Sequence, residues 1–112
     1  MQIGGHTLEF FDCFEVCQGG PEACRILLNG QLIEGGKFDP SPLLVDGAIL
    51  LPMRRNSFFK SGYVLTQIDP SDGSLKVISK IHSYMKLRRI DGQAVEFWTN
   101  ASEGETAILL LP

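Results

Sequence analysis

Short apolar stretches alternate with turn sequences along most of this chain. Four of the turns contain an Asn-Gly or Asp-Gly pair, at residues 29–30, 46–47, 69–73 and 91–92. These pairs suit tight hairpin loops, in which both loop residues take positive φ. The pattern therefore predicts a series of antiparallel hairpins with little or no helix.

The clearest predicted hairpin runs from Gly62 to His82, around the Asp-Pro-Ser-Asp-Gly turn. Side chains alternate between the two faces of a strand. In the returning strand the apolar side chains share one face and the polar ones the other, with Leu75, Val77 and Ile81 against Lys76, Lys80 and His82. This alternation predicts a half-buried strand with a basic outer face.

Other segments are apolar on both faces, namely residues 26–28, 43–45, 48–51 and 108–111. Such runs suit strands that are covered on both sides, in a sandwich, a closed barrel or a subunit interface. The pattern predicts an all-β fold, an antiparallel meander of about eight short strands forming a barrel or sandwich. It also predicts a single β-rich domain over residues 1–112.

The turn order over residues 43–81 also resembles that of β-propeller blades. A closed propeller usually needs at least about four blades of four strands. A chain of 112 residues could therefore supply only part of one. Propeller-blade-like sheets completed by oligomerisation are the alternative architecture.

The Asp91-Gly92 hairpin leaves two registers open. With a loop formed by these two residues, Ile90 would lie opposite Gln93 and Arg88 opposite Val95, and neither face would be cleanly polar. Either a β-bulge shifts the pairing, or both faces are partly covered. The second option would fit self-association.

Three cysteines, Cys13, Cys17 and Cys24, bear on metal binding and cellular location. With His6 they have the spacing His-x6-Cys-x3-Cys-x6-Cys, which lacks the paired Cys-x2-Cys of zinc knuckles. We therefore predict no metal site and no cofactor, and small buried free thiols instead. An odd cysteine count, no secretory signal and no apolar run of about 18 residues favour a cytoplasmic protein without a membrane span.

Charge is distributed unevenly along the chain. Formal charges amount to −5 for residues 1–53, +6 for residues 54–89 and −4 for residues 90–112, within a net charge of −3. A segment with its own sign can present a field that the net charge hides. Its strand positions divide between faces, so only part of the +6 can form one surface, and the remainder is expected to pair with acidic strands.

Two groups of residues are the predicted binding sites. The first is a loop that combines Arg with aromatic residues, the types enriched at interface hot spots. It comprises Arg54, Arg55, Phe58, Phe59 and Lys60. The second lies on the sheet and comprises Lys76, Lys80, His82 and Arg88. Together they favour a non-catalytic binding protein that contacts a protein partner and self-associates into a homo-oligomer.

Two alternative functions remain open at this stage. Basic residues among aromatics suit a β-barrel that binds a small anion or single-stranded nucleic acid. A pI near 5.3 argues against nucleic acid, because such domains usually have a pI above about 9. A small hydrolase with unidentified paired carboxylates is the other alternative. No nucleophile, zinc-protease or nucleotide-binding motif occurs in the sequence, so no catalytic residue is predicted.

Overall fold

A computed structural model of the chain describes residues 1–15, 22–56 and 61–112. The described residues form strands and turns without a helix, which confirms the predicted all-β class. The strands are β1 (Gln2–Ile3), β2 (His6–Glu15), β3 (Glu22–Leu28), β4 (Gln31–Leu32), β5 (Lys37–Phe38), β6 (Leu43–Val45), β7 (Ala48–Asn56), β8 (Ser61–Ile68), β9 (Leu75–Val77), β10 (Lys86–Asp91), β11 (Ala94–Trp98) and β12 (Thr106–Leu110). The described part thus contains more strands than the eight predicted, because several have only two or three residues.

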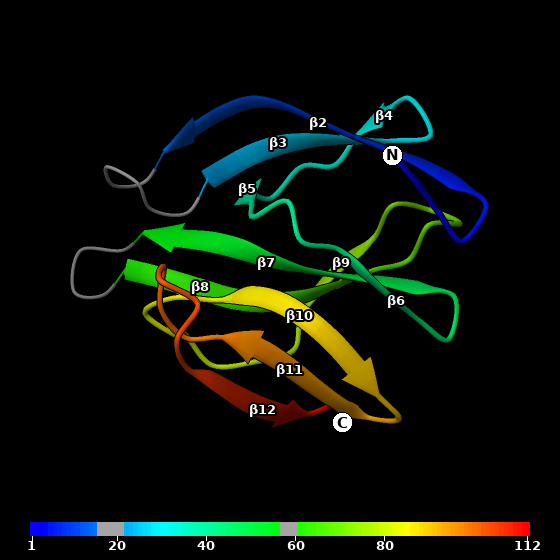
Figure 1. Cartoon of the computed structure of the whole chain (residues 1–112). Coiled ribbons are helices and arrows are strands. Elements are labelled where there is room, and N and C mark those ends of the chain that lie inside the picture. Colours follow the sequence, from blue (N-terminus) through cyan, green and yellow to red (C-terminus); the bar gives the residue numbers. More distant parts are fainter. Residues whose placement is uncertain (16–21, 57–60) are drawn as a thin grey trace.

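The strands form two antiparallel sheets. The large sheet has nine strands in the order β1-β2-β3-β5-β7-β8-β9, with β4 paired to β3 and β6 to β7. The small sheet has the order β10-β11-β12. Figure 1 shows β2 and β3 above, β7 and β8 in the middle, and the small sheet below. Within the described residues neither sheet closes into a barrel.

Strands β7 and β8 are buried on both faces, and the apolar run at residues 48–51 predicted this for β7. Ile49, Leu51 and Val64 pack into a cluster with β2, β3 and β5. Leu50 and Leu65, on the opposite face, pack into a second cluster with β10 and β11. Since consecutive strand residues point to opposite faces, the continuous apolar run supplies both cores. The two clusters therefore share the same central strands.

The short turns form where the sequence predicts them. Asn29 and Gly30 have φ of 51° and 81°, and Asp46 and Gly47 have φ of 48° and 79°. The flanking residues pair directly, Leu28 with Gln31 and Val45 with Ala48. In the longer turn, the carboxylate of Asp69 accepts a hydrogen bond from the Ser71 N–H at 2.9 Å. The Asp72 carboxylate likewise accepts one from the Ser74 N–H at 2.8 Å, and such local hydrogen bonds favour aspartate in a turn.

The strand predicted to return to His82 ends at Val77, so the prediction of a basic outer face extending to His82 is wrong. Val77 is 38% exposed, whereas Ile81 packs against the core of the large sheet. His82 rejoins the sheet through an isolated bridge to Tyr63. Gly62 permits this approach, because a Cβ there would overlap the carbonyl oxygen of His82.

The bulged register is the correct one for the β10–β11 hairpin. Gly92 and Gln93 form the loop, and Ile90 pairs with Val95 rather than with Gln93. A register shift falls between Leu87 and Arg89. This extra residue keeps Leu87 in the core and leaves both Arg88 and Arg89 exposed.

A disulfide corrects the prediction of free thiols at two of the three cysteines. Cys13 and Cys24 are bonded to each other across β2 and β3, with an S–S distance of 2.11 Å. Cys13 lies in a bulge of β2, next to Asp12, whose φ is 50°. Cys17 lies outside the described residues.

Candidate functional site

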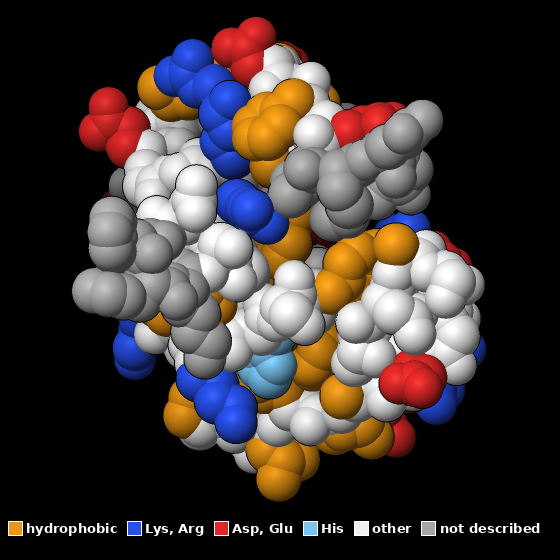
Figure 2. All heavy atoms as spheres, turned by 90° about the vertical axis from the view of Figure 1, so that its left-hand side faces the viewer, with side chains coloured by type: hydrophobic (Ala, Val, Ile, Leu, Met, Phe, Trp, Pro, Cys, Tyr) orange, Lys and Arg blue, Asp and Glu red, His pale blue; other side chains and the backbone are white. Residues whose placement is uncertain are grey.

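The predicted basic residues do not gather into one surface. Arg54 and Arg55 lie near the end of β7, and Phe58, Phe59 and Lys60 fall outside the described residues. Lys76 is an exposed residue of β9, and Lys80 is exposed in the segment that follows. Figure 2 shows Lys and Arg side chains in separate groups among hydrophobic ones. The structure therefore divides the predicted site among three places.

Two acidic residues of the C-terminal part of the chain, Glu96 of β11 and Glu103 of the β11–β12 connection, pair with the basic side chains of β10. Lys86 contacts Glu103 at 2.8 Å, and its ammonium has a raised pKa because it donates a hydrogen bond to that carboxylate. Arg88 and Arg89 both contact Glu96, with 3.1 Å from Arg89 Nε. The expected pairing of the basic segment with an acidic strand is confirmed for Arg88 and Arg89, because Glu96 belongs to β11, whereas Glu103 lies in the connection between β11 and β12.

His82 is half-buried rather than on a polar strand face. Its ring makes an edge contact with Phe97, with 5.2 Å between centroids. Nearby, the Arg54 guanidinium lies 5.6 Å from the centroid of the Tyr63 ring. Burial raises the pKa of Tyr63 despite this cation. These residues pack between the two sheets, and their positions suit a structural role.

The outer face of the small sheet carries exposed apolar side chains from the run at residues 108–111, which the sequence predicted to be covered on both sides. Ile108 is 64% exposed and Leu110 74%, while Leu109 between them packs into the core. Ile108 lies directly opposite Glu96 on β11. At the other side of this face, the Arg88 guanidinium lies 5.3 Å from the centroid of the Trp98 ring. Apolar, aromatic and Arg side chains thus share one surface, a composition typical of protein interfaces.

The free edge of β12 adds backbone hydrogen-bonding groups to this surface. Leu111 N–H donates to Gln93 O at 2.8 Å, and Thr99 N–H to Glu105 O at 2.9 Å. In an antiparallel ladder, hydrogen-bonded pairs alternate with non-hydrogen-bonded ones. The N–H and C=O groups of residues 106, 108 and 110 therefore point away from β11. Among the described residues, no strand pairs with them.

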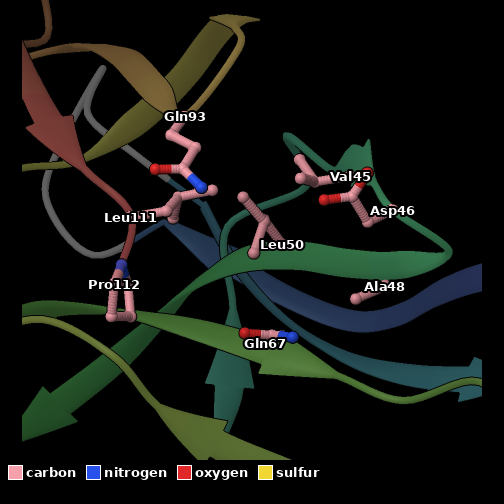
Figure 3. A pocket seen from close by; sticks show the side chains of 8 residues that line it. All are labelled: Val45, Asp46, Ala48, Leu50, Gln67, Gln93, Leu111 and Pro112. Atoms are coloured by element: carbon pink, nitrogen blue, oxygen red, sulfur yellow. The ribbon is translucent and has the colours of Figure 1, made fainter.

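A small pocket of about 120 Å³ lies between the two sheets, at the end near the β10–β11 turn. Figure 3 shows Leu50 and Leu111 between the amides of Gln67 and Gln93. Asp46 also lines the pocket, whereas Lys76, Lys80 and Arg88 do not. Because its one charged side chain is acidic, the pocket does not favour the predicted small anion.

No family model, curated protein or solved structure matches the chain. Within the described ranges, no helix is long and apolar enough to cross a bilayer. The fold and its most exposed apolar surface define a two-sheet β domain with an uncovered edge strand.

Proposed function

We propose that the protein is a non-catalytic binding domain that self-associates through the edge of β12. The observation that carries this proposal is the coincidence, at Ile108 and Leu110, of exposed apolar side chains and outward-facing backbone groups. Natural proteins usually protect such an edge with a charge, a proline or a bulge. Residues 106–110 contain none of these. An edge left in this state favours pairing with another strand.

A second copy of this chain is the occupant that the edge suits best. Antiparallel pairing centred on Ile108 brings each Ile108 against its equivalent and each Thr106 against Leu110 of the other copy. Three pairs with outward-facing groups supply about six backbone hydrogen bonds. The strand has no charged side chain to repel its equivalent, and the antiparallel direction keeps the two Glu105 carboxylates apart. Closed twofold pairing of this kind is the commonest form of homo-oligomer.

This pairing defines the finer architecture that we infer. The large sheet and the small sheet stack as in a sandwich, and two small sheets join into one six-stranded sheet across the dimer. Trp98 and Arg88 lie farther along the same outer face and enlarge the surface available to a protein partner. A cytoplasmic location remains the sequence-based expectation. Arg54 and Arg55 remain a second predicted contact, separate from this edge.

A charge on the edge should abolish self-association. We expect the wild-type chain to sediment as a dimer and Ile108→Lys as a monomer, because pairing would bring two ammonium groups face to face in an apolar contact. Sedimentation velocity over a range of concentrations makes the measurement. Val77→Lys is the matched control, since Val77 is also an exposed strand residue but lies on β9 of the other sheet.

Two results would contradict the proposal. One is a wild-type chain that sediments as a monomer at every concentration. The other is a dimer that persists in Ile108→Lys, whether or not Val77→Lys dissociates it. Circular dichroism of both variants establishes that the monomers have retained the β fold.

A further inference from the structure

Two sulfur atoms and a carboxylate converge at the end of the β2–β3 hairpin. The ligand atoms of Cys13, Glu22 and Cys24 all lie within 4.8 Å of one another. Cys13 and Glu22 are exposed, whereas Cys24 is fully buried. The sequence spacing did not indicate this group, because Glu22 joins it and His6 does not. His6 lies at the opposite end of β2, 3.0 Å from the Asn29 amide.

We propose that reduction of the Cys13–Cys24 disulfide creates a binding site for Zn²⁺. In the oxidised form both sulfur atoms are used in the S–S bond, so neither is a thiolate ligand. A dithiol reductant supplies two electrons and two protons, which break the S–S bond and form two thiols, while the reductant becomes a disulfide. Zn²⁺ then replaces the two thiol protons, which are released to solvent.

The donor set suits zinc better than the harder divalent ions. Thiolates favour Zn²⁺ over Mg²⁺ and Ca²⁺, which prefer oxygen ligands. Two thiolates and the Glu22 carboxylate supply three ligands, and water occupies the fourth tetrahedral position. A site with one open position resembles catalytic rather than closed structural zinc sites.

The surrounding ladder holds these residues in place when the disulfide opens. Phe11 pairs with Arg25 on one side of the bulge, and Phe14 pairs with Ala23 on the other. Cys24 also pairs with Phe38 of β5, so its backbone lies between two strands. The sulfur atoms need to separate only from bonding distance to the distance between two zinc ligands. Rotation of the exposed Cys13 side chain is the smallest movement that allows this.

Two basic residues, Arg25 and Lys37, belong to the strands β3 and β5 that pair around the cluster. The guanidinium of Arg25, next to Cys24 in sequence, lies 3.5 Å from the carboxylate of Asp12. The ammonium of Lys37 lies 4.5 Å from the centroid of the Phe14 ring. In a reducing compartment, paired cysteines of this kind serve metal binding more often than structural disulfides.

Zinc binding by the reduced protein tests the proposal. The Cys17→Ser variant serves as the background, so that Cys13 and Cys24 are the only thiols. After reduction with a phosphine and removal of oxygen, we expect one Zn²⁺ per chain in competition with a chromophoric chelator. The oxidised protein should bind none. Co²⁺ in place of Zn²⁺ should give the thiolate charge-transfer band and the intense visible bands of tetrahedral coordination.

The Glu22→Gln variant distinguishes a zinc site with three protein ligands from adventitious zinc binding by the two thiols alone. We expect it to weaken zinc binding by about tenfold or more, because even the loss of a group that only supports a zinc ligand costs about 10–100-fold in affinity. Glu9→Gln, an exposed glutamate of β2 away from the cluster, should leave the affinity unchanged. Reduced protein without stoichiometric zinc, or equal affinities for the two variants, would overturn the proposal. If reduction alone unfolds the chain, we expect zinc to restore its β-sheet circular dichroism. Failure of zinc to do so would also overturn the proposal.

Discussion

Replacing Phe97 with alanine should destabilise the protein by about 3–5 kcal/mol, the usual cost of deleting a fully buried aromatic side chain. Phe97 is 2% exposed and lies on β11 in the cluster that joins the small sheet to β7 and β8. Its ring also contacts His82. The variant therefore leaves a cavity where the two sheets meet.

Equilibrium unfolding in urea measures this loss directly. Phe14→Ala is the matched control, because the same side chain is removed where it is 45% exposed. We expect the control to cost less than about 1 kcal/mol. Equal losses for the two variants would mean that the small sheet is not held by the second core. A changed dependence on urea concentration would indicate that the sheets unfold separately.

The sequence predicts those features of the fold that depend on neighbouring residues. Asn29-Gly30 and Asp46-Gly47 adopt positive φ and form two-residue loops, since the preference for this conformation belongs to the loop residues. The double burial of β7 is also predictable, because a strand with apolar residues on both faces needs cover on both.

Long-range register is what the sequence leaves open. The bulge in β10 decides that Arg88 and Arg89 both reach Glu96, and nothing local at those residues specifies it. The bulge in β2 similarly brings Cys13 beside Cys24. Each shift depends on which partner strand buries its apolar face, and that is a property of the assembled sheets.

The candidate site was predictable only in part, for the same reason. The charge of Arg88 made it a predicted binding residue, and its guanidinium does lie on the proposed face. The carboxylate of Glu96, however, balances its positive charge. Ile108 and Leu110 belong to an apolar run whose pattern predicts a strand that is covered on both sides or lies in a subunit interface. Among the residues that the structure describes, one side of this run is uncovered. Only the position of β12 at a sheet edge distinguishes it from a central strand.

The burial of Asp39 and its raised pKa could not be predicted from the sequence. Asp39 is 3% exposed, and burial raises its pKa from 3.8 to about 6, against the opposing effects of Ser41 and Lys86. Its Oδ2 atom has no hydrogen-bond partner among the described residues. Ser41 links this region to the small sheet, because its Oγ accepts a hydrogen bond from Leu87 N–H at 3.0 Å. A carboxylate buried here in charged form is costly to the fold.

The pH dependence of stability should reveal this cost. A carboxyl group whose pKa is raised by folding stabilises the protein fully below its unfolded pKa of 3.8, and that contribution is lost as pH rises through about 6. Between about pH 4 and about pH 8, the wild-type chain should therefore lose up to about 3 kcal/mol that Asp39→Asn does not lose. Urea unfolding at a series of pH values gives the difference. Comparing the slopes with pH removes any constant cost of burying the amide.

Asp72→Asn provides a control of opposite sign. The backbone N–H of Ser74 donates to the Asp72 carboxylate at 2.8 Å, and this hydrogen bond lowers the pKa of Asp72. Its stabilising contribution is present above the unfolded pKa and is lost as pH falls. The Asp72 substitution should accordingly flatten the acid side of the stability profile and leave the neutral side unchanged. If Asp39→Asn gave the wild-type pH dependence between about pH 4 and about pH 8, the Asp39 carboxylate would have to be solvated or paired in the folded protein, and burial would not control its ionisation.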